Sequence, residues 1–229
     1  MLQRLKSKLA QTNNSHMSLW FVRHGESEGN ALGDTCPIMH DTALTQEGRD
    51  EALRVASYLQ KNDITVTDIY TSPKGRSRET AEVIGSVLGL SVKIKDGLSE
   101  RDWGDWKDLR WMEASDRLDQ LPLEERYTFV PPGGESWKQM ESRLLLTLEE
   151  IVEENTAGEN VLIVMHRGGL RAVLPLLAKA GIERHKEFSV PTGALSKFSF
   201  VKEAFDFVGF VPKALLPLVS LATTVSHWF

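Results

Sequence analysis

Two short apolar runs in this sequence each end in a histidine. The first covers residues 18–24 (SLWFVRH), and the second covers residues 161–165 (VLIVM), directly before His166. Continuous apolar runs of this length are typical of strands that are buried on both faces of a parallel sheet. Stretches with helical spacing lie between the two runs, and strands that alternate with helices predict an α/β fold. We expect a three-layer sandwich in which helices flank a mainly parallel central sheet.

Further segments continue this alternation along the chain. From their composition, we also expect strands at residues 67–71, 91–95 and 194–201. Helices are expected over residues 46–61, from Pro73 to Gly89, from Trp137 onward, and from the second histidine through Ala180. The stretch between them, residues 97–134, is expected to be irregular.

Local signals set the expected helix ends. Thr45 can cap the helix over residues 46–61. Pro73 is expected in the first turn of its helix, where a missing N–H costs nothing. Gly181 is expected to stop the helix that follows the second histidine.

Composition and spacing predict a single domain. The 229 residues contain 41% hydrophobic and 26% charged side chains, which is ordinary for a globular protein of this size. We find no repeat or linker that divides the chain, so one domain is predicted over residues 18–207. Residues 1–17 form a basic leader that we expect to be poorly ordered, with a targeting or membrane-touching helix as the alternative.

Residues 208–229 form an apolar C-terminal extension. It holds Pro217 and several polar residues, and a spanning helix needs about 20 predominantly apolar residues, so we reject a membrane span. One interpretation is a tail that docks on its own domain or on a second subunit, which would give a homodimer. The other is a peripheral membrane contact, with Trp228 and Phe229 at the level of the lipid headgroups.

Charge and cysteine content restrict the partners and the compartment. The formal net charge is −5, and we find no block of lysine and arginine that could follow a nucleic-acid backbone, so no nucleic-acid partner is expected. A local group of arginines on an acidic protein suits a small anionic substrate. Cys36 is the one cysteine, so no intrachain disulfide can form, and a reducing, cytoplasmic location is expected.

The residues after the first run carry groups that suit phosphate chemistry. In an open α/β sheet, ligands bind at the carboxyl ends of the strands, so His24 and His166 are expected to face one pocket. An arginine such as Arg23 can bind phosphate oxygens through two donors. Gly25 is expected to let the main chain approach a phosphate closely.

Four segments, in this order, resemble the histidine phosphatase superfamily, the phosphoglycerate mutase-like proteins. They are RHG at residues 23–25, TSPKGR at 71–76 with Glu79, LSE at 98–100 with Gly104 and Trp106, and MHRGG at 165–169. Asn30, ALT at residues 43–45 and PGGES at residues 132–136 fit the same pattern. The resemblance covers about residues 18–200, nearly the whole predicted domain.

The resemblance and the chemistry of these side chains imply the same roles. His24 is the expected nucleophile, because a neutral imidazole can accept a phosphoryl group and divide one difficult displacement into two easier ones. Arg23, Arg76 and His166 are expected to stabilise the charge on the phosphoryl oxygens, with His166 either donating a hydrogen bond or carrying a proton. Glu100 is expected to protonate the leaving alkoxide and then to activate water, a task that suits an acid of raised pKa.

Additional phosphate contacts are expected from Ser27, Asn30 and Gly168. No metal and no other cofactor is expected, because the arginines supply the positive charge that a magnesium ion would otherwise provide. Four residues are candidates for a metal site, but their spacing matches no zinc pattern: His24, Glu26, His40 and His166.

Several assignments leave alternatives open. Arg78 competes with Arg76 as the pocket arginine, and either Glu79 or Glu135 could be the acid instead of Glu100. Trp103, Trp106 and Trp111 either pack a loop or hold the substrate. Arg167 stands where the family often has glycine, and it either adds a cation to the site or points into solvent.

The favoured function is a metal-independent phosphatase that hydrolyses a small phosphorylated metabolite through a phosphohistidine. Mutases of the family usually carry a tryptophan-rich segment soon after RHG and a longer insertion before the second histidine, and this chain has neither. A cofactor-dependent phosphoglycerate mutase and a catalytically silent module that binds a phosphorylated ligand are the alternatives. Loops at residues 31–42 and 101–131 are expected to form the pocket walls that set substrate specificity.

Overall fold

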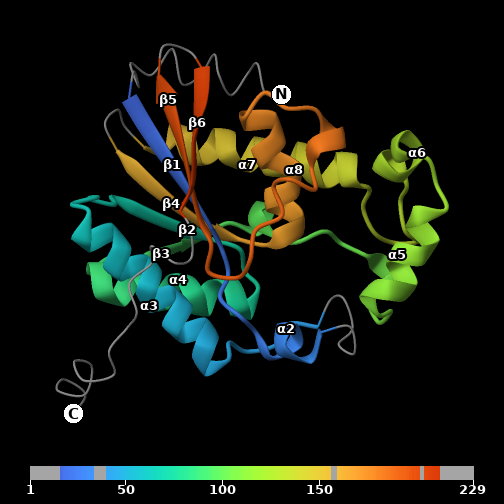
Figure 1. Ribbon diagram of the computed structural model, residues 1–229, viewed down its shortest axis with the longest axis horizontal. Coiled ribbons are helices and arrows are strands. Elements are labelled where there is room, and N and C mark those ends of the chain that lie inside the picture. Colours follow the sequence, from blue (N-terminus) through green and yellow to red (C-terminus); the bar gives the residue numbers. More distant parts are fainter. Residues whose placement is uncertain (1–15, 34–39, 156–158, 202–203, 212–229) are drawn as a thin grey trace.

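The computed structural model describes residues 16–33, 40–155, 159–201 and 204–211. Its centre is a six-stranded sheet with the order β3-β2-β4-β1-β5-β6 (Figure 1). The strands are β1 (His16–Arg23), β2 (Asp68–Thr71), β3 (Val92–Ile94), β4 (Asn160–Met165), β5 (Leu195–Val201) and β6 (Ala204–Val211). The first four run parallel, whereas β5 pairs antiparallel with β1 and β6 pairs antiparallel with β5. The predicted α/β sandwich with a mainly parallel sheet is therefore confirmed.

Helices lie on both faces of this sheet and beside its carboxyl edge. They are α2 (Glu28–Leu32), α3 (Gln46–Lys61), α4 (Gly75–Leu88), α5 (Trp111–Asp119), α6 (Leu123–Thr128), α7 (Trp137–Glu153) and α8 (Arg167–Leu177). Alternate side chains of β1 point to opposite faces, so Leu19 and Phe21 pack with α7 and α8, while Trp20 and Val22 pack with α3 and α4. Both faces of the sheet are thus buried, as the continuous apolar runs predict.

The pairing of β1 with β4 places the two histidines together. The strands are adjacent and parallel, and Arg23 is the register partner of Met165. His24 and His166 are the next residues, so both leave the sheet at the same edge although they lie far apart in the sequence. The fold therefore brings these two imidazoles to neighbouring strand ends.

The predicted helix over residues 46–61 is confirmed, and the Thr45 Oγ1 accepts a hydrogen bond from the Gly48 N–H over 3.1 Å. The expectation for Pro73 is wrong, because α4 begins at Gly75 with Lys74 as its N-cap, so the proline precedes the helix. There the Ser72 hydroxyl accepts from the Lys74 N–H over 3.2 Å and shapes the turn.

The last helix and the last strand also differ from the expectation. α8 ends at Leu177 instead of reaching Ala180, because the chain turns at Lys179, whose φ of 57° is left-handed. The predicted final strand over residues 194–201 is β5, and a further strand, β6, crosses the predicted boundary between residues 207 and 208. The rest of the predicted leader and extension, residues 1–15 and 212–229, lies outside the described residues.

The expectation that residues 97–134 are irregular is wrong in its second half. This stretch contains α5 and α6, which project from the sandwich beside the carboxyl edge of the sheet (Figure 1). Trp103, Ala114 and Leu118 form a small buried cluster that joins these helices. α5 has nine residues and buries two, and α6 has six residues and buries none, so each is too short to show the extended apolar periodicity that predicts a helix.

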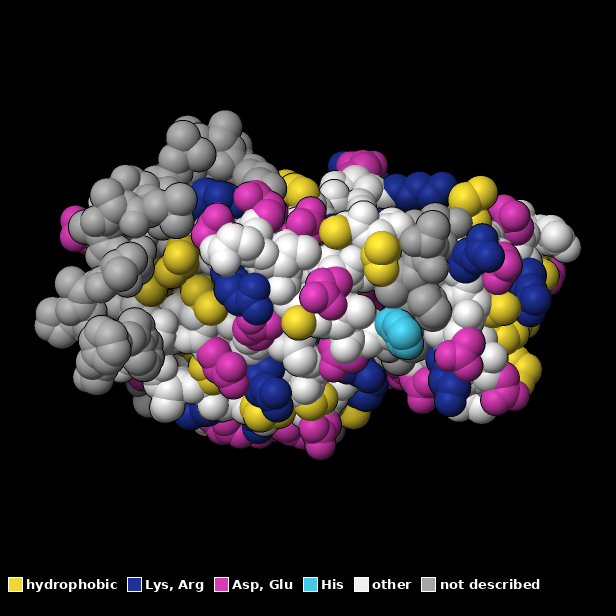
Figure 2. All heavy atoms as spheres, turned by 90° about the horizontal axis from the view of Figure 1, so that it is seen from below, with side chains coloured by type: hydrophobic (Ala, Val, Ile, Leu, Met, Phe, Trp, Pro, Cys, Tyr) yellow, Lys and Arg dark blue, Asp and Glu magenta, His cyan; other side chains and the backbone are white. Residues whose placement is uncertain are grey.

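Figure 2 shows one face of the molecule on which lysine and arginine side chains are interspersed with aspartate and glutamate over the described residues. None of the helices in the described part of the chain is both long enough and apolar enough to cross a membrane.

Candidate functional site

The two histidines at the carboxyl edge lie side by side. The centroids of the His24 and His166 rings are 5.2 Å apart, and the rings are inclined by 57°. Both side chains are buried, with exposed fractions of 3% and 0%. The His166 Nε2 lies 2.8 Å from the Ser72 hydroxyl, whereas its Nδ1 is buried without a hydrogen-bond partner among the described residues.

Two contacts fix the tautomer of His24. Its Nδ1 lies 2.8 Å from the carbonyl oxygen of Gly25, and a carbonyl can only accept, so Nδ1 carries the proton. Its Nε2 accepts a hydrogen bond from the Arg76 Nε over 3.3 Å, which requires a free lone pair on Nε2. The imidazole is therefore held with Nε2 as the available nucleophilic atom.

Burial and neighbouring cations keep both imidazoles neutral. Burial, and then the charges of Arg76 and Arg23, hold the pKa of His24 well below its usual value of 6.5. Burial and the charge of Arg76 likewise hold the pKa of His166 well below 6.5. Without a bound anion, His166 is thus a neutral group, and its two expected roles, donating a hydrogen bond and carrying a proton, both stay predictions.

Arg76 reaches His24 from the first turn of α4, and two contacts hold it there. Its Nη1 donates to the Asp41 carboxylate over 3.2 Å and to the carbonyl oxygen of His40 over 3.3 Å. Asp41 also accepts from the N–H of Gly75 over 2.7 Å, so this aspartate ties the start of α4 to the arginine. The competing Arg78 has an exposed side chain, and among the described residues it pairs with Glu82. The choice of Arg76 agrees with this geometry.

Arg23 provides a second cation at the end of β1. Its Nη1 donates to the carbonyl oxygen of Val190 over 2.8 Å. Burial, followed by repulsion from Arg167, lowers the pKa of Arg23 to about 10, so it remains charged at neutral pH. A cation held this way, without a paired carboxylate among the described residues, attracts an anionic ligand.

Glu100 lies in the loop that follows the short 3-10 helix Asp96–Leu98, and two backbone N–H groups hold its carboxylate. The Gly168 N–H donates to Oε2, and the Arg101 N–H donates to Oε1, each over 2.9 Å. The competing acids have other partners: Glu79 pairs with Arg49, and Glu135 pairs with Arg143. Glu100 is thus the one of the three that shares a pocket with His24.

Two glycines have roles different from those expected. A Cβ at Gly25 would lie 2.3 Å from the carbonyl oxygen of Gly48, and the Gly25 N–H donates to the Thr80 hydroxyl over 3.0 Å. Gly25 therefore makes room for the first turn of α3, and its N–H is not free for a phosphate. The N–H of Gly168 is likewise taken by Glu100, so the expected phosphate contact through this N–H is not supported.

Ser27 and Asn30 form the capping box of α2. The Ser27 N–H and hydroxyl donate to the Asn30 Oδ1 over 3.2 and 3.1 Å, and the Asn30 N–H donates back to the Ser27 Oγ over 3.3 Å. Asn30 is exposed, and its amide Nδ2 has no acceptor among the described residues, so it can still donate to a ligand. Both residues line the pocket, and they also fix the loop that follows His24.

A pocket of about 450 Å³ collects most of the candidate residues. The expected site residues on its wall are Arg23, His24, Ser27, Asn30, Arg76, Glu100 and Gly168. His166 is not on this wall, because it lies fully buried beside His24. Trp106 packs against Phe129, with ring centroids 5.2 Å apart. Trp103 and Trp111 line the pocket and also pack against each other, with ring centroids 6.0 Å apart, so contact of these two with the substrate stays a prediction.

Three residues of the site escape the sequence reasoning. Asp41 holds Arg76, Ser72 contacts His166, and Thr80 accepts from Gly25. All three act through hydrogen bonds between segments that are distant in the sequence, so single-sequence patterns cannot reveal these contacts. Ser72 does lie within the TSPKGR segment that carries the resemblance.

Comparison with known proteins identifies relatives over most of the chain. The family model of the histidine phosphatase superfamily (branch 1) matches residues 19–211. A 2,3-bisphosphoglycerate-dependent phosphoglycerate mutase from Parvibaculum lavamentivorans is 32% identical over 205 residues, which cover 86% of this chain and 95% of the relative.

Solved structures add phosphatases to these relatives. A mycobacterial glucosyl-3-phosphoglycerate phosphatase has a TM-score of 0.70 and 26% identity, covering 83% of this chain and 97% of its own. An alpha-ribazole phosphatase from Shigella flexneri has a TM-score of 0.73 over 86% of this chain and 97% of its own. Its identity of 24% makes it evidence for the fold alone.

Proposed function

Because this chain belongs to the histidine phosphatase superfamily, we propose that it hydrolyses phosphomonoesters through a phosphohistidine formed on His24. The observation that carries the proposal is the fixed tautomer of His24. Its Nδ1–H is bound to the Gly25 carbonyl, and its Nε2 lone pair meets Arg76 at a pocket that also holds Arg23 and Glu100.

In the first step, the Nε2 lone pair of His24 attacks phosphorus. The N–P bond forms as the P–O bond to the leaving alcohol breaks, and Glu100 gives its proton to the departing oxygen. A bound phosphomonoester replaces Nε2 as the acceptor for the Arg76 donors, which frees the lone pair for attack. The Nδ1–H bond to Gly25 then stabilises the positive charge that develops on the ring.

In the second step, water attacks the phosphohistidine. Glu100, now a carboxylate, takes a proton from the water, the P–N bond breaks, and its electron pair returns to Nε2. Inorganic phosphate leaves, and His24 is again a neutral imidazole. The same carboxyl group thus acts first as acid and then as base.

Positive charge around the phosphoryl oxygens comes from this chain's own residues. Arg23 and Arg76 bind and stabilise the oxygens in the transition state, and His166 stands beside them as a hydrogen-bonding group. The beginning of α2 adds the Asn30 amide. We propose that this set needs no metal ion, and that the substrate is a small phosphorylated metabolite that fits a pocket of about 450 Å³.

A phosphoglycerate mutase is the second candidate, and the 32% identity with the mutase from Parvibaculum lavamentivorans favours it. The chemistry differs only in what accepts the phosphoryl group. A mutase passes it from histidine to a hydroxyl of a phosphoglycerate, whereas a phosphatase gives it to water. The same site residues serve both reactions, so the product must be measured.

The test combines a trapped intermediate with a product assay. Acid-sensitive, base-stable phosphate should appear on the wild-type protein after reaction with a ³²P-labelled phosphomonoester, and His24→Ala should carry none. With 3-phosphoglycerate and 2,3-bisphosphoglycerate, release of inorganic phosphate supports a phosphatase and formation of 2-phosphoglycerate supports a mutase. Binding of phosphate without turnover would point to a silent binding module. Loss of activity on adding a chelator would refute the metal-independent mechanism.

A further inference from the structure

The wall of the pocket carries cations that the proposed reaction does not use. Arg167 and Arg171 stand one turn apart on α8 and both line the pocket with His24. A second hollow of about 270 Å³ adjoins it and shares the walls made by Trp111, Trp137 and Arg171. The space available to a ligand therefore extends from His24, past α8, to the helices α5 and α6.

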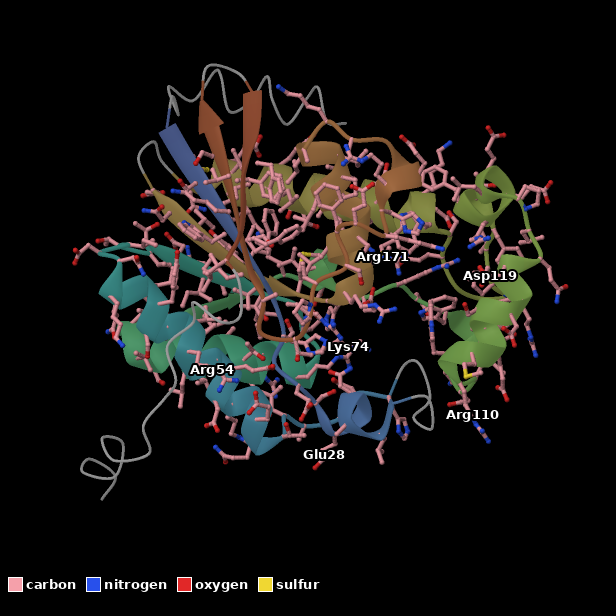
Figure 3. The ribbon with its side chains drawn as sticks, viewed as in Figure 1. Glu28, Arg54, Lys74, Arg110, Asp119 and Arg171 are labelled. Atoms are coloured by element: carbon pink, nitrogen blue, oxygen red, sulfur yellow. The ribbon has the colours of Figure 1, made fainter. Side chains whose placement is uncertain are left out.

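Each of the two arginines lies over an aromatic ring that lines this space. The Arg167 guanidinium carbon is 5.6 Å from the centroid of Trp111, at the start of α5. That of Arg171 is 5.5 Å from the centroid of Trp137, at the start of α7. Figure 3 shows Arg171 on the side of α8 that faces α5 and α6. These contacts hold the two guanidinium groups across the pocket, and they answer the open question about Arg167, which faces the pocket.

Neither arginine has an acidic partner among the described residues. The Arg171 Nη2 instead meets the His185 Nδ1 at 2.6 Å. Burial is the main cause that lowers the pKa of Arg171 to about 10, and the charge of Arg167 is the second. Arg167 in turn is the largest charge that lowers the pKa of Arg23. Arg167 thus repels both Arg23 and Arg171, and Glu100 is the one carboxylate on the same pocket wall among the described residues.

The position of Arg167 adds to this excess of positive charge. It is the first residue of α8, and the first turn of this helix holds no acid. The amino end of a helix carries partial positive charge, so a cation there is unfavourable and an anion is favourable. Such an arrangement is stabilised when a negative group binds between the cations.

We propose that Arg167 and Arg171 bind a second anionic group of the substrate, on the leaving-group side of the phosphoester. The flat part of the leaving group would lie along Trp111 and Trp137, which line the same space. The substrate class is therefore a phosphomonoester whose leaving group carries an aromatic or otherwise flat skeleton and a distal carboxylate or phosphate. This inference rests on the proposed function, because it assigns the leaving group of that reaction.

The test compares two esters that differ in one charge, 2-naphthyl phosphate and 6-carboxy-2-naphthyl phosphate. The wild-type kcat/KM should favour the carboxylated ester by about ten-fold, as a charge-assisted contact allows. Arg167→Met removes the charge with little change of bulk and should bring this ratio close to one. Arg167→Lys should keep part of the preference, and Arg78→Met, which changes an exposed arginine outside the pocket, should keep all of it. Melting temperatures of each variant would verify that the fold is retained.

A binding measurement separates this inference from the proposed function. Calorimetric titration of His24→Ala with the same two esters should show tighter binding of the carboxylated one, and Arg167→Met in this background should remove the difference. Equal kcat/KM values for the two esters in the wild type, or an unchanged ratio in Arg167→Met, would overturn the inference while leaving the phosphatase intact. If the wild type hydrolyses neither ester, the proposed function fails, and the calorimetric difference alone decides whether the anion site exists.

Discussion

The backbone N–H of Gly168 donates to the Oε2 of Glu100 over 2.9 Å, and a Cβ at position 168 would lie only 2.2 Å from Oε1. The first turn of α8 therefore approaches the carboxylate closely enough to exclude any side chain. His166 lies two residues earlier, between β4 and α8, so the proposed acid is positioned by the same segment that carries the second histidine. This explains a glycine whose expected phosphate contact the structure does not support.

Gly168→Ala should therefore displace Glu100 without changing any charge. We expect kcat for alkyl phosphates to fall by one to two orders of magnitude, toward the effect of losing the acid, which is typically about 10²–10⁴-fold. The KM should change less, because Arg23 and Arg76 remain in place. Steady-state kinetics with glycerol phosphate would measure this. An unchanged kcat would show that the contact with Gly168 does not position the acid.

Glu100→Gln should slow hydrolysis in a way that depends on the leaving group. A poor leaving group such as an alkoxide needs the proton, whereas 4-nitrophenolate needs little, so the loss should be much larger for alkyl than for aryl phosphates. Glu135→Gln is the matched control, because Glu135 pairs with Arg143 and lies outside the pocket. It should affect both classes of ester alike. If Glu100→Gln slowed the hydrolysis of both classes of ester equally, Glu100 would have only a binding or structural role.

Asp41→Asn should weaken phosphate binding through Arg76. The carboxylate holds the guanidinium at 3.2 Å, and an amide at this position would lose the charge of that contact while retaining its size. We expect KM to rise several-fold, by less than in Arg76→Ala, because the carbonyl oxygen of His40 still holds the arginine. Arg78→Ala serves as the control and should leave KM near the wild-type value. The inhibition constant for inorganic phosphate should rank the wild type and these variants in the same order, because phosphate binds without being turned over.

The parts of the fold that follow local patterns could be predicted from the sequence. α3 and α7 have apolar side chains at three- and four-residue steps, and β1 and β4 are continuous apolar runs, so burial alone nearly determines them. α5 and α6 are harder to predict, because helices of nine and six residues are short and bury only two side chains between them. Their stability depends on a small cluster that the sequence pattern does not reveal.

In the candidate site, too, some features could be predicted from the sequence and others could not. The pocket residues Arg23, His24, Arg76 and Glu100 could be chosen from the sequence because strand ends and a family resemblance mark them. The function of Gly25 and Gly168 could not, because it depends on which backbone approaches each glycine: Gly48 in one case and the Glu100 carboxylate in the other. Such contacts arise from tertiary packing between segments more than 20 residues apart, which no local pattern records.

Acidification should destabilise this protein below pH 6.5. Burial is the main cause that lowers the pKa values of His24, His166 and His185, the last of them to about 4. The unfolded chain, with histidines near 6.5, therefore binds more protons than the folded chain between pH 6.5 and the folded pKa values. The free energy of unfolding thus falls as the pH drops through this window, and it is unaffected by these groups above pH 7.

His185 offers the cleanest measurement of this effect, because it lies outside the proposed catalytic residues. His185 accepts from Arg171 through Nδ1, so its protonation would also remove that contact. Urea unfolding at pH 7.0 and pH 5.5 should show that His185→Gln loses less stability than the wild type over this interval, by about 1 kcal/mol. If His185→Gln and the wild type lose the same amount, then His185 is not held neutral by its burial beside Arg171.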